Sequence, residues 1–121
     1  MEHKQIIDGI EGIFRKYQCD EKLREALKGS HQHLLLFGHE GIGYFLTPDR
    51  EILKMQGFGL YFSSPRDAAQ DFFERKSPCT LTGAKAMLEE DLGARVEKLK
   101  KDYARSFDRE IGGYVVQHPE V

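Results

Sequence analysis

The spacing of apolar residues changes twice along this chain, and the segment between the two changes limits the fold most. Between His33 and Phe62 the apolar residues fall in short runs separated by turn residues, whereas on both sides they recur at steps of three and four. Four residues or fewer join each run to the next. Parallel strands need a connection of about a dozen residues or more. The segment therefore predicts an antiparallel meander, with strands at residues 33–37, 42–47, 51–55 and 58–62.

Helices are predicted on both sides of the meander. Residues 3–17 carry an apolar face, and Asp20 can cap a second short helix that ends at Gly29. After the meander, Ser64-Pro65-Arg66-Asp67 combines a capping serine, a proline suited to the first helical position and an acid that completes a capping box. A helix starting there would cover the sheet and end at Ser77-Pro78.

A longer helical pattern occupies residues 82–108. Its apolar stripe consists of Leu88, Leu92, Val96, Leu99, Tyr103 and Phe107. Gly93 lies inside the pattern, so one long helix and two shorter helices both fit. Beyond Gly112-Gly113, residues 114–116 have the composition of a last strand that returns to the sheet.

These elements predict one α+β domain over residues 1–121, with an antiparallel sheet of three to five strands. N-terminal helices, one covering helix and the long C-terminal helix would complete it. The predicted core comprises Ile10, Ile13, Phe14, Leu35, Phe37, Phe45, Leu53, Leu60, Phe62, Phe72, Leu88, Leu92, Val96 and Leu99.

Composition and charge narrow the class of protein. The formal net charge of −2 gives no overall field that favours nucleic acid or an anionic membrane. The N-terminus has no apolar stretch of signal-peptide length, and the longest apolar run, Leu34–Phe37, is far too short to span a bilayer. Cys19 and Cys79 are too few for the disulfide framework of a small secreted domain. We expect a cytoplasmic protein with free thiols and no cofactor.

Enzymatic motifs are scarce, so catalysis is not the leading interpretation. No serine lies in a Gly-x-Ser-x-Gly turn, and the glycines near His39 do not follow the order of a phosphate-binding loop. One alternative is a metal site or a small metal-dependent enzyme. His31 and His33 would face the same way on a strand, with His39 in the following turn, and three imidazoles can hold zinc.

A second alternative is a nucleic-acid-associated regulator. The long helix carries basic residues on a common side, broadly opposite its apolar stripe: Arg95, Lys98, Lys101, Arg105 and Arg109. A basic stripe on an exposed helix can follow phosphates. Asp102 lies in the same arc, however, and the whole chain has 18 Lys and Arg against 20 Asp and Glu.

The leading hypothesis is a small non-enzymatic protein-interaction module, such as an adaptor, inhibitor or regulator. Its partner would be another protein, and Tyr44, Phe58 and Tyr61 are candidate contacts if one face of the sheet is exposed, because aromatic residues are enriched in interface cores. A homodimer is also open, since the stripe on the long helix can cover its own sheet or pair with a second chain.

Overall fold

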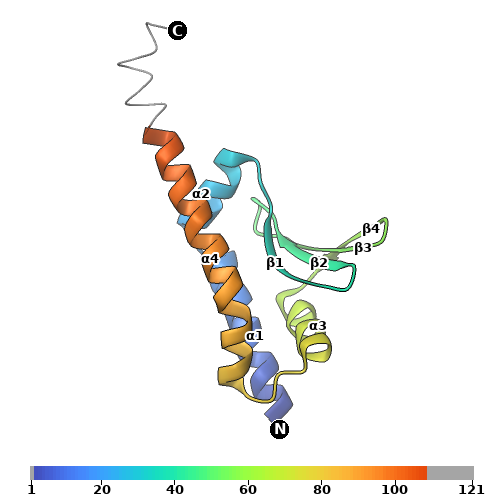
Figure 1. The fold of residues 1–121 in the computed structure, drawn as a ribbon. Coiled ribbons are helices and arrows are strands. Elements are labelled where there is room, and N and C mark those ends of the chain that lie inside the picture. Colours follow the sequence, from blue (N-terminus) through green and yellow to red (C-terminus); the bar gives the residue numbers. More distant parts are fainter. Residues whose placement is uncertain (1, 109–121) are drawn as a thin grey trace, which may run out of the picture.

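The computed structural model describes residues 2–108 and confirms the α+β prediction (Figure 1). Two N-terminal helices precede a four-stranded antiparallel sheet of order β1-β2-β3-β4, and two helices follow it. The elements are α1 (Glu2–Gln18), α2 (Glu21–Ser30), β1 (Leu34–His39), β2 (Ile42–Leu46), β3 (Ile52–Gln56), β4 (Gly59–Ser63), α3 (Pro65–Lys76) and α4 (Leu81–Asp108). The last strand predicted at residues 114–116 lies outside the described residues.

Short turns with left-handed backbone close the hairpins. Glu40 and Gly41 both have positive φ, 45° and 84°, as in the type I′ turn that suits the twist of antiparallel strands. Gly57, with φ of 58°, starts the two-residue loop between β3 and β4. Between β2 and β3 the Thr47 hydroxyl accepts hydrogen bonds from the main-chain N–H groups of Asp49 and Glu51, at 3.2 and 3.1 Å. These turns fix the order of the meander.

The two predicted helix caps are confirmed. The Asp20 side chain accepts a hydrogen bond from the N–H of Leu23 at 3.0 Å, and the Ser64 side chain accepts one from the N–H of Asp67 at 3.0 Å. The Asp20 carboxylate also accepts a hydrogen bond from the Lys100 ammonium at 2.7 Å, which connects α4 to the start of α2.

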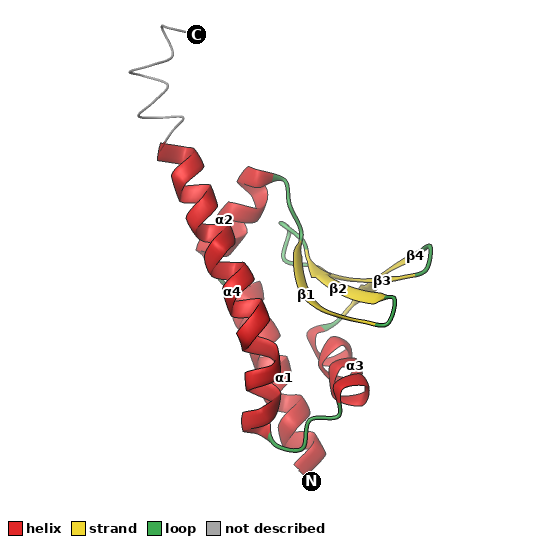
Figure 2. Cartoon of the chain, in the orientation of Figure 1, coloured by secondary structure: helices red, strands yellow, loops and turns green. Residues whose placement is uncertain are grey.

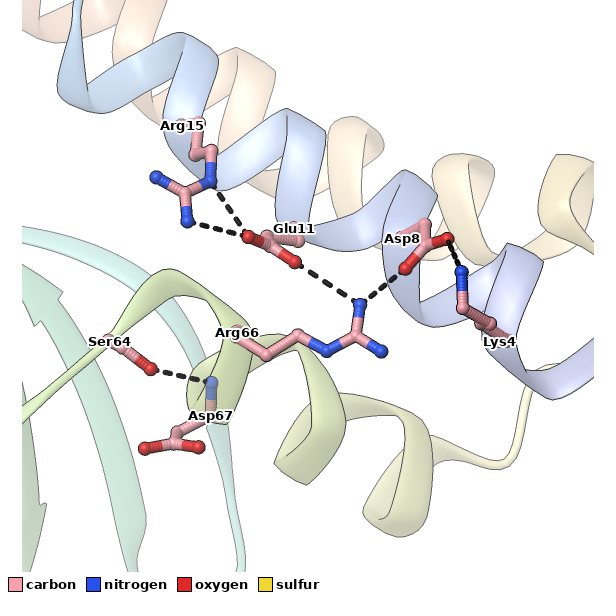
Figure 3. A network of polar contacts seen from close by, with 7 residues as sticks. All are labelled: Lys4, Asp8, Glu11, Arg15, Ser64, Arg66 and Asp67. Carbon is pink, nitrogen blue, oxygen red and sulfur yellow. Dashed lines mark hydrogen bonds and ion pairs between the residues drawn. The ribbon is translucent and has the colours of Figure 1, made fainter.

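An ionic network fastens α3 to α1 (Figure 3). The Arg66 guanidinium, in the first turn of α3, donates to Asp8 and, at 3.2 Å, to Glu11 on α1. The hydrogen bond from Arg66 is the largest influence on Asp8 and lowers the pKa of its carboxyl. Because Arg66 and Asp8 remain partly exposed to solvent, the network orients the two helices more than it stabilises them.

The long C-terminal pattern is one continuous helix, which decides between the two arrangements that its sequence allowed. α4 passes through Gly93 without a break. Leu88, Leu92 and Val96 are buried in the core, and Leu99 packs against it, so the apolar stripe is largely used within the chain. No helix in residues 2–108 is both long enough and apolar enough to cross a bilayer.

The core lies on one face of the sheet, here called the inner face. Ile42, Tyr44, Leu46 and Ile52 point into it, together with side chains from α1 and α3. Phe37 joins them: its ring stacks on Tyr44 at 4.8 Å and meets the edge of Phe72 at 5.0 Å.

Part of the predicted core is wrong. The prediction that Leu35, Phe45, Leu53, Leu60 and Phe62 are core residues fails, because all five lie on the opposite face or are exposed. The strands are apolar on both faces, so alternation alone does not tell which face meets the helices. The other members of the predicted core are buried or, for Leu99, partly buried.

Candidate interaction surface

The second face of the sheet, here called the outer face, is apolar and lies opposite the inner face. The strand register places its residues side by side: Leu35, Gly43, Phe45, Leu53, Met55, Leu60 and Phe62. None of them is charged. Exposure rises across the sheet, since Phe45 and Leu53 are half-buried whereas Met55, Leu60 and Phe62 are 47%, 58% and 75% exposed.

On the β1–β2 half of the outer face, neighbouring side chains of the same two strands cover the backbone. A Cβ atom on Gly43 would lie 2.9 Å from Cε1 of Phe45 and 3.7 Å from Cδ1 of Leu35, so the Phe45 ring covers the glycine with Leu35 beside it. The β3–β4 half has no comparable cover, and in Figure 1 this end of the sheet projects away from the helices. The open part of the surface is therefore its β4 side.

β4 is an edge strand without the usual protection. Edge strands of soluble proteins commonly carry lysine, proline or a bulge that discourages pairing with another chain. Gly59-Leu60-Tyr61-Phe62-Ser63 has no charged residue and no proline, and it pairs with β3 without a register shift. Phe58, in the preceding turn, is fully exposed.

At the opposite edge of the sheet, α4 contacts the Leu35–Leu36 part of β1. A bulge between Leu35 and Phe37 shifts the register of β1. There the Arg95 guanidinium donates to the carbonyl oxygens of Leu35 and Leu36, at 2.9 and 3.1 Å. Within residues 2–108, β1 and β4 are the two edge strands (Figure 2), and β4 has no comparable contact with a helix.

Two of the three predicted partner contacts lie on this open side. Phe58 and Tyr61 are exposed, and Tyr61 folds over Gly59 on the inner side of β4, beyond the part that helices cover. Tyr44 does not share this surface, because its side chain is only 2% exposed on the inner face. Leu60 and Phe62, predicted to be core residues, are exposed on this side as well. Their exposure could have been predicted, because the last strand of a meander lies at a sheet edge unless the chain returns.

Behind the sheet, Tyr44 belongs to a polar cluster that attaches α3. Its hydroxyl donates to Asp71, which also accepts from Arg75 Nε at 2.7 Å and lies 3.6 Å from Lys54 Nζ. Burial, followed by the Asp71 carboxylate, raises the pKa of Tyr44 far above its usual value. Burial opposes ionisation of Asp71, but the hydrogen bonds from Tyr44 and Arg75 outweigh it and lower the pKa of that carboxyl. Because these side chains bind one another, the cluster has a structural role: it holds α3 against the sheet.

The predicted histidine cluster does not assemble. His31 ends α2 in a left-handed conformation, His33 is exposed, and His39 lies near its neighbour Glu40, with 3.8 Å between Nε2 and Oε2. In the part of the chain that the structure describes, no three His, Cys, Asp or Glu side chains come close enough to hold a metal ion. Cys19 and Cys79 are both exposed free thiols, as predicted.

The predicted basic face is partly engaged. Arg95 binds the β1 carbonyls, and Lys98 binds Asp102 at 2.6 Å, whereas Lys101 and Arg105 are exposed. Arg109 lies outside the described residues. Nucleic-acid binding by this face stays a prediction.

Comparisons with family models, curated proteins and solved structures give no match to this chain.

Proposed function

We propose that this chain is a small non-enzymatic protein-interaction module whose contact surface is the outer face and open edge of β3 and β4. The observation that carries the proposal is the exposure of Met55, Leu60 and Phe62 side by side on an uncharged face of a strand pair. Contiguous apolar patches are uncommon on soluble monomers, and they typically mark a contact site.

The chemistry of the surface favours a polypeptide partner. An open strand edge offers main-chain donors and acceptors, and the apolar side chains beside it supply area to bury. A phosphate-bearing partner is held mainly by Lys and Arg, and β4 carries neither. The one charged side chain of β3, Lys54, lies on the inner face with Asp71.

Affinity capture with matched variants tests this proposal. The baits are the wild type, the double variant Leu60→Lys/Phe62→Lys and the control Met87→Lys. Met87 is a similarly exposed apolar residue, 49%, but it lies on α4. Since all three positions are exposed, folding is expected to survive, and unfolding curves check this. We expect the wild type and the control to capture the same proteins, and the double variant to lose them.

The proposal would be contradicted by a folded double variant that captures the same proteins as the wild type. It would also fail if Met87→Lys removed them as completely as the double variant does. Either result would place the contact surface elsewhere on the molecule.

A further inference from the structure

We infer that β4 pairs in antiparallel fashion with β4 of a second copy of this chain, which joins two four-stranded sheets into one of eight strands. The inference rests on the proposed function, because it takes the β3–β4 side as the contact surface and names the partner. Its basis is the arrangement of main-chain groups, side chains and charge along β4.

The hairpin geometry determines which main-chain groups are free. Gln56 and Gly59 flank a two-residue loop, and such flanking residues exchange both main-chain hydrogen bonds. Hydrogen-bonded and non-bonded pairs then alternate, so Gly59, Tyr61 and Ser63 bond to β3. Leu60 and Phe62 instead direct their N–H and C=O groups to the open edge.

The register that pairs Leu60 with Phe62 of the second copy satisfies the free groups of both residues in both copies. In a two-fold pairing centred on Tyr61, Leu60 lies opposite Phe62 of the second copy, and the two residues exchange both hydrogen bonds. Leu60 and Phe62 also share the outer face, flanked by Met55 and Leu53. This register therefore joins the two outer faces into one apolar strip. A shift by one residue would place main-chain groups that already bond to β3 at the contact.

The charge pattern fits a second copy better than a charged peptide. Residues 52–63 contain one charged side chain, Lys54, which lies on the inner face 3.6 Å from Asp71. Identical strands can therefore approach without like charges on the outer face. An acidic or basic peptide would find no opposite charge there to select it.

The two-fold symmetry of the proposed contact limits the assembly to two copies. Pairing that leaves an edge free can continue into a filament, whereas an isologous contact closes with two chains. At the β1 edge, Arg95 of α4 binds the carbonyl oxygens of Leu35 and Leu36. Two copies joined through β4 would use the open edge of each described sheet, so a closed dimer is expected.

The first experiment is the solution mass of the full chain by sedimentation equilibrium, up to about 100 µM, where a dimer of micromolar affinity is well populated. We expect the wild type and Met87→Lys to reach twice the monomer mass. In Leu60→Lys/Phe62→Lys the proposed register places lysines opposite lysines, which should weaken the dimer by at least about 100-fold.

A cysteine variant tests the register. In a Cys19→Ser/Cys79→Ser background, Tyr61→Cys would face its own copy in a non-hydrogen-bonded pair, with Cα atoms at about 4.5 Å, within the range for a disulfide. Oxidation should cross-link this variant rapidly. Phe62→Cys and Met87→Cys, whose copies lie apart in the proposed register, should remain mostly unlinked.

The outcomes separate this inference from the proposed function. A wild type that stays monomeric, while capture of other proteins still depends on Leu60 and Phe62, overturns the dimer and keeps the interaction module. A monomer whose capture is unaffected by the double variant overturns both. A dimer that survives the two lysines, or one that cross-links at Met87→Cys instead of Tyr61→Cys, forms through another surface and overturns the β4 pairing.

Discussion

Apolar residues lie on both faces of the sheet, yet those of β2 on the inner face and those of β4 on the outer face have opposite environments. Ile42, Tyr44 and Leu46 on the inner face are nearly inaccessible, whereas Leu60 and Phe62 on the outer face are mostly exposed. The helices make the difference, because side chains from α1 and α3 share the core with the inner face, whereas Leu60 and Phe62 are outside it. An apolar strand face therefore indicates a surface that is normally buried. Whether elements of the same chain bury it depends on where the helices pack.

The two edges of the sheet differ in the same way. At β1, beside a bulge, Arg95 donates hydrogen bonds to two main-chain carbonyls from within the chain. At β4 the strand is regular and uncharged, so its free groups are available to another chain. The comparison predicts that substitutions on the covered side reduce folding stability, and that those on the open side reduce association.

The largest expected effect comes from the covered side. Phe72 is fully buried and meets the Phe37 ring edge-on, so Phe72→Ala should lower the free energy of unfolding by about 3–5 kcal/mol. Denaturant unfolding measures it, with the fully exposed Phe58→Ala as the matched control, expected within about 0.5 kcal/mol. Similar losses in both variants would remove the distinction between the two sides.

An intermediate effect is expected at the closed edge. Arg95→Ala removes two charge-assisted hydrogen bonds to β1 carbonyls, which should cost about 1.5–3 kcal/mol. Lys101→Ala, an exposed change on the same helix, serves as the control and should stay within about 0.5 kcal/mol. Unfolding curves again give the answer, and equal values for the two variants would mean that Arg95 does not secure this edge.

Local chemistry made much of the fold predictable from the sequence. The Ser64-Pro65-Arg66-Asp67 cap marks the start of α3. The short connections between the strands favour an antiparallel sheet over a parallel one. The continuity of α4 through Gly93 was not predictable, because a glycine weakens a helix by only about 1 kcal/mol and packing along the helix decides.

The choice of core face was not predictable, for a physical reason. Phe45 and Leu53 alternate with Tyr44 and Ile52, and both sets are apolar enough to form a core. The bulge after Leu35 adds to the difficulty, since it turns Phe37 to the inner face against the simple alternation. The exposure of Phe58 and Tyr61 was predicted correctly. Tyr44, predicted to be a contact, is buried, and Phe62, predicted to be a core residue, is exposed.

The smallest expected change in folding stability is that of a Phe62 variant. It tests most directly the claim that the outer face is a contact surface and not part of the folding core. In dilute protein, Phe62→Ala should change the free energy of unfolding by no more than about 0.5 kcal/mol. At higher concentration the wild-type melting temperature should rise through dimer formation, and the variant should lose much of that rise. A loss of about 3 kcal/mol in dilute protein, comparable to a buried phenylalanine, would show that the outer face belongs to the folding core and would contradict this account.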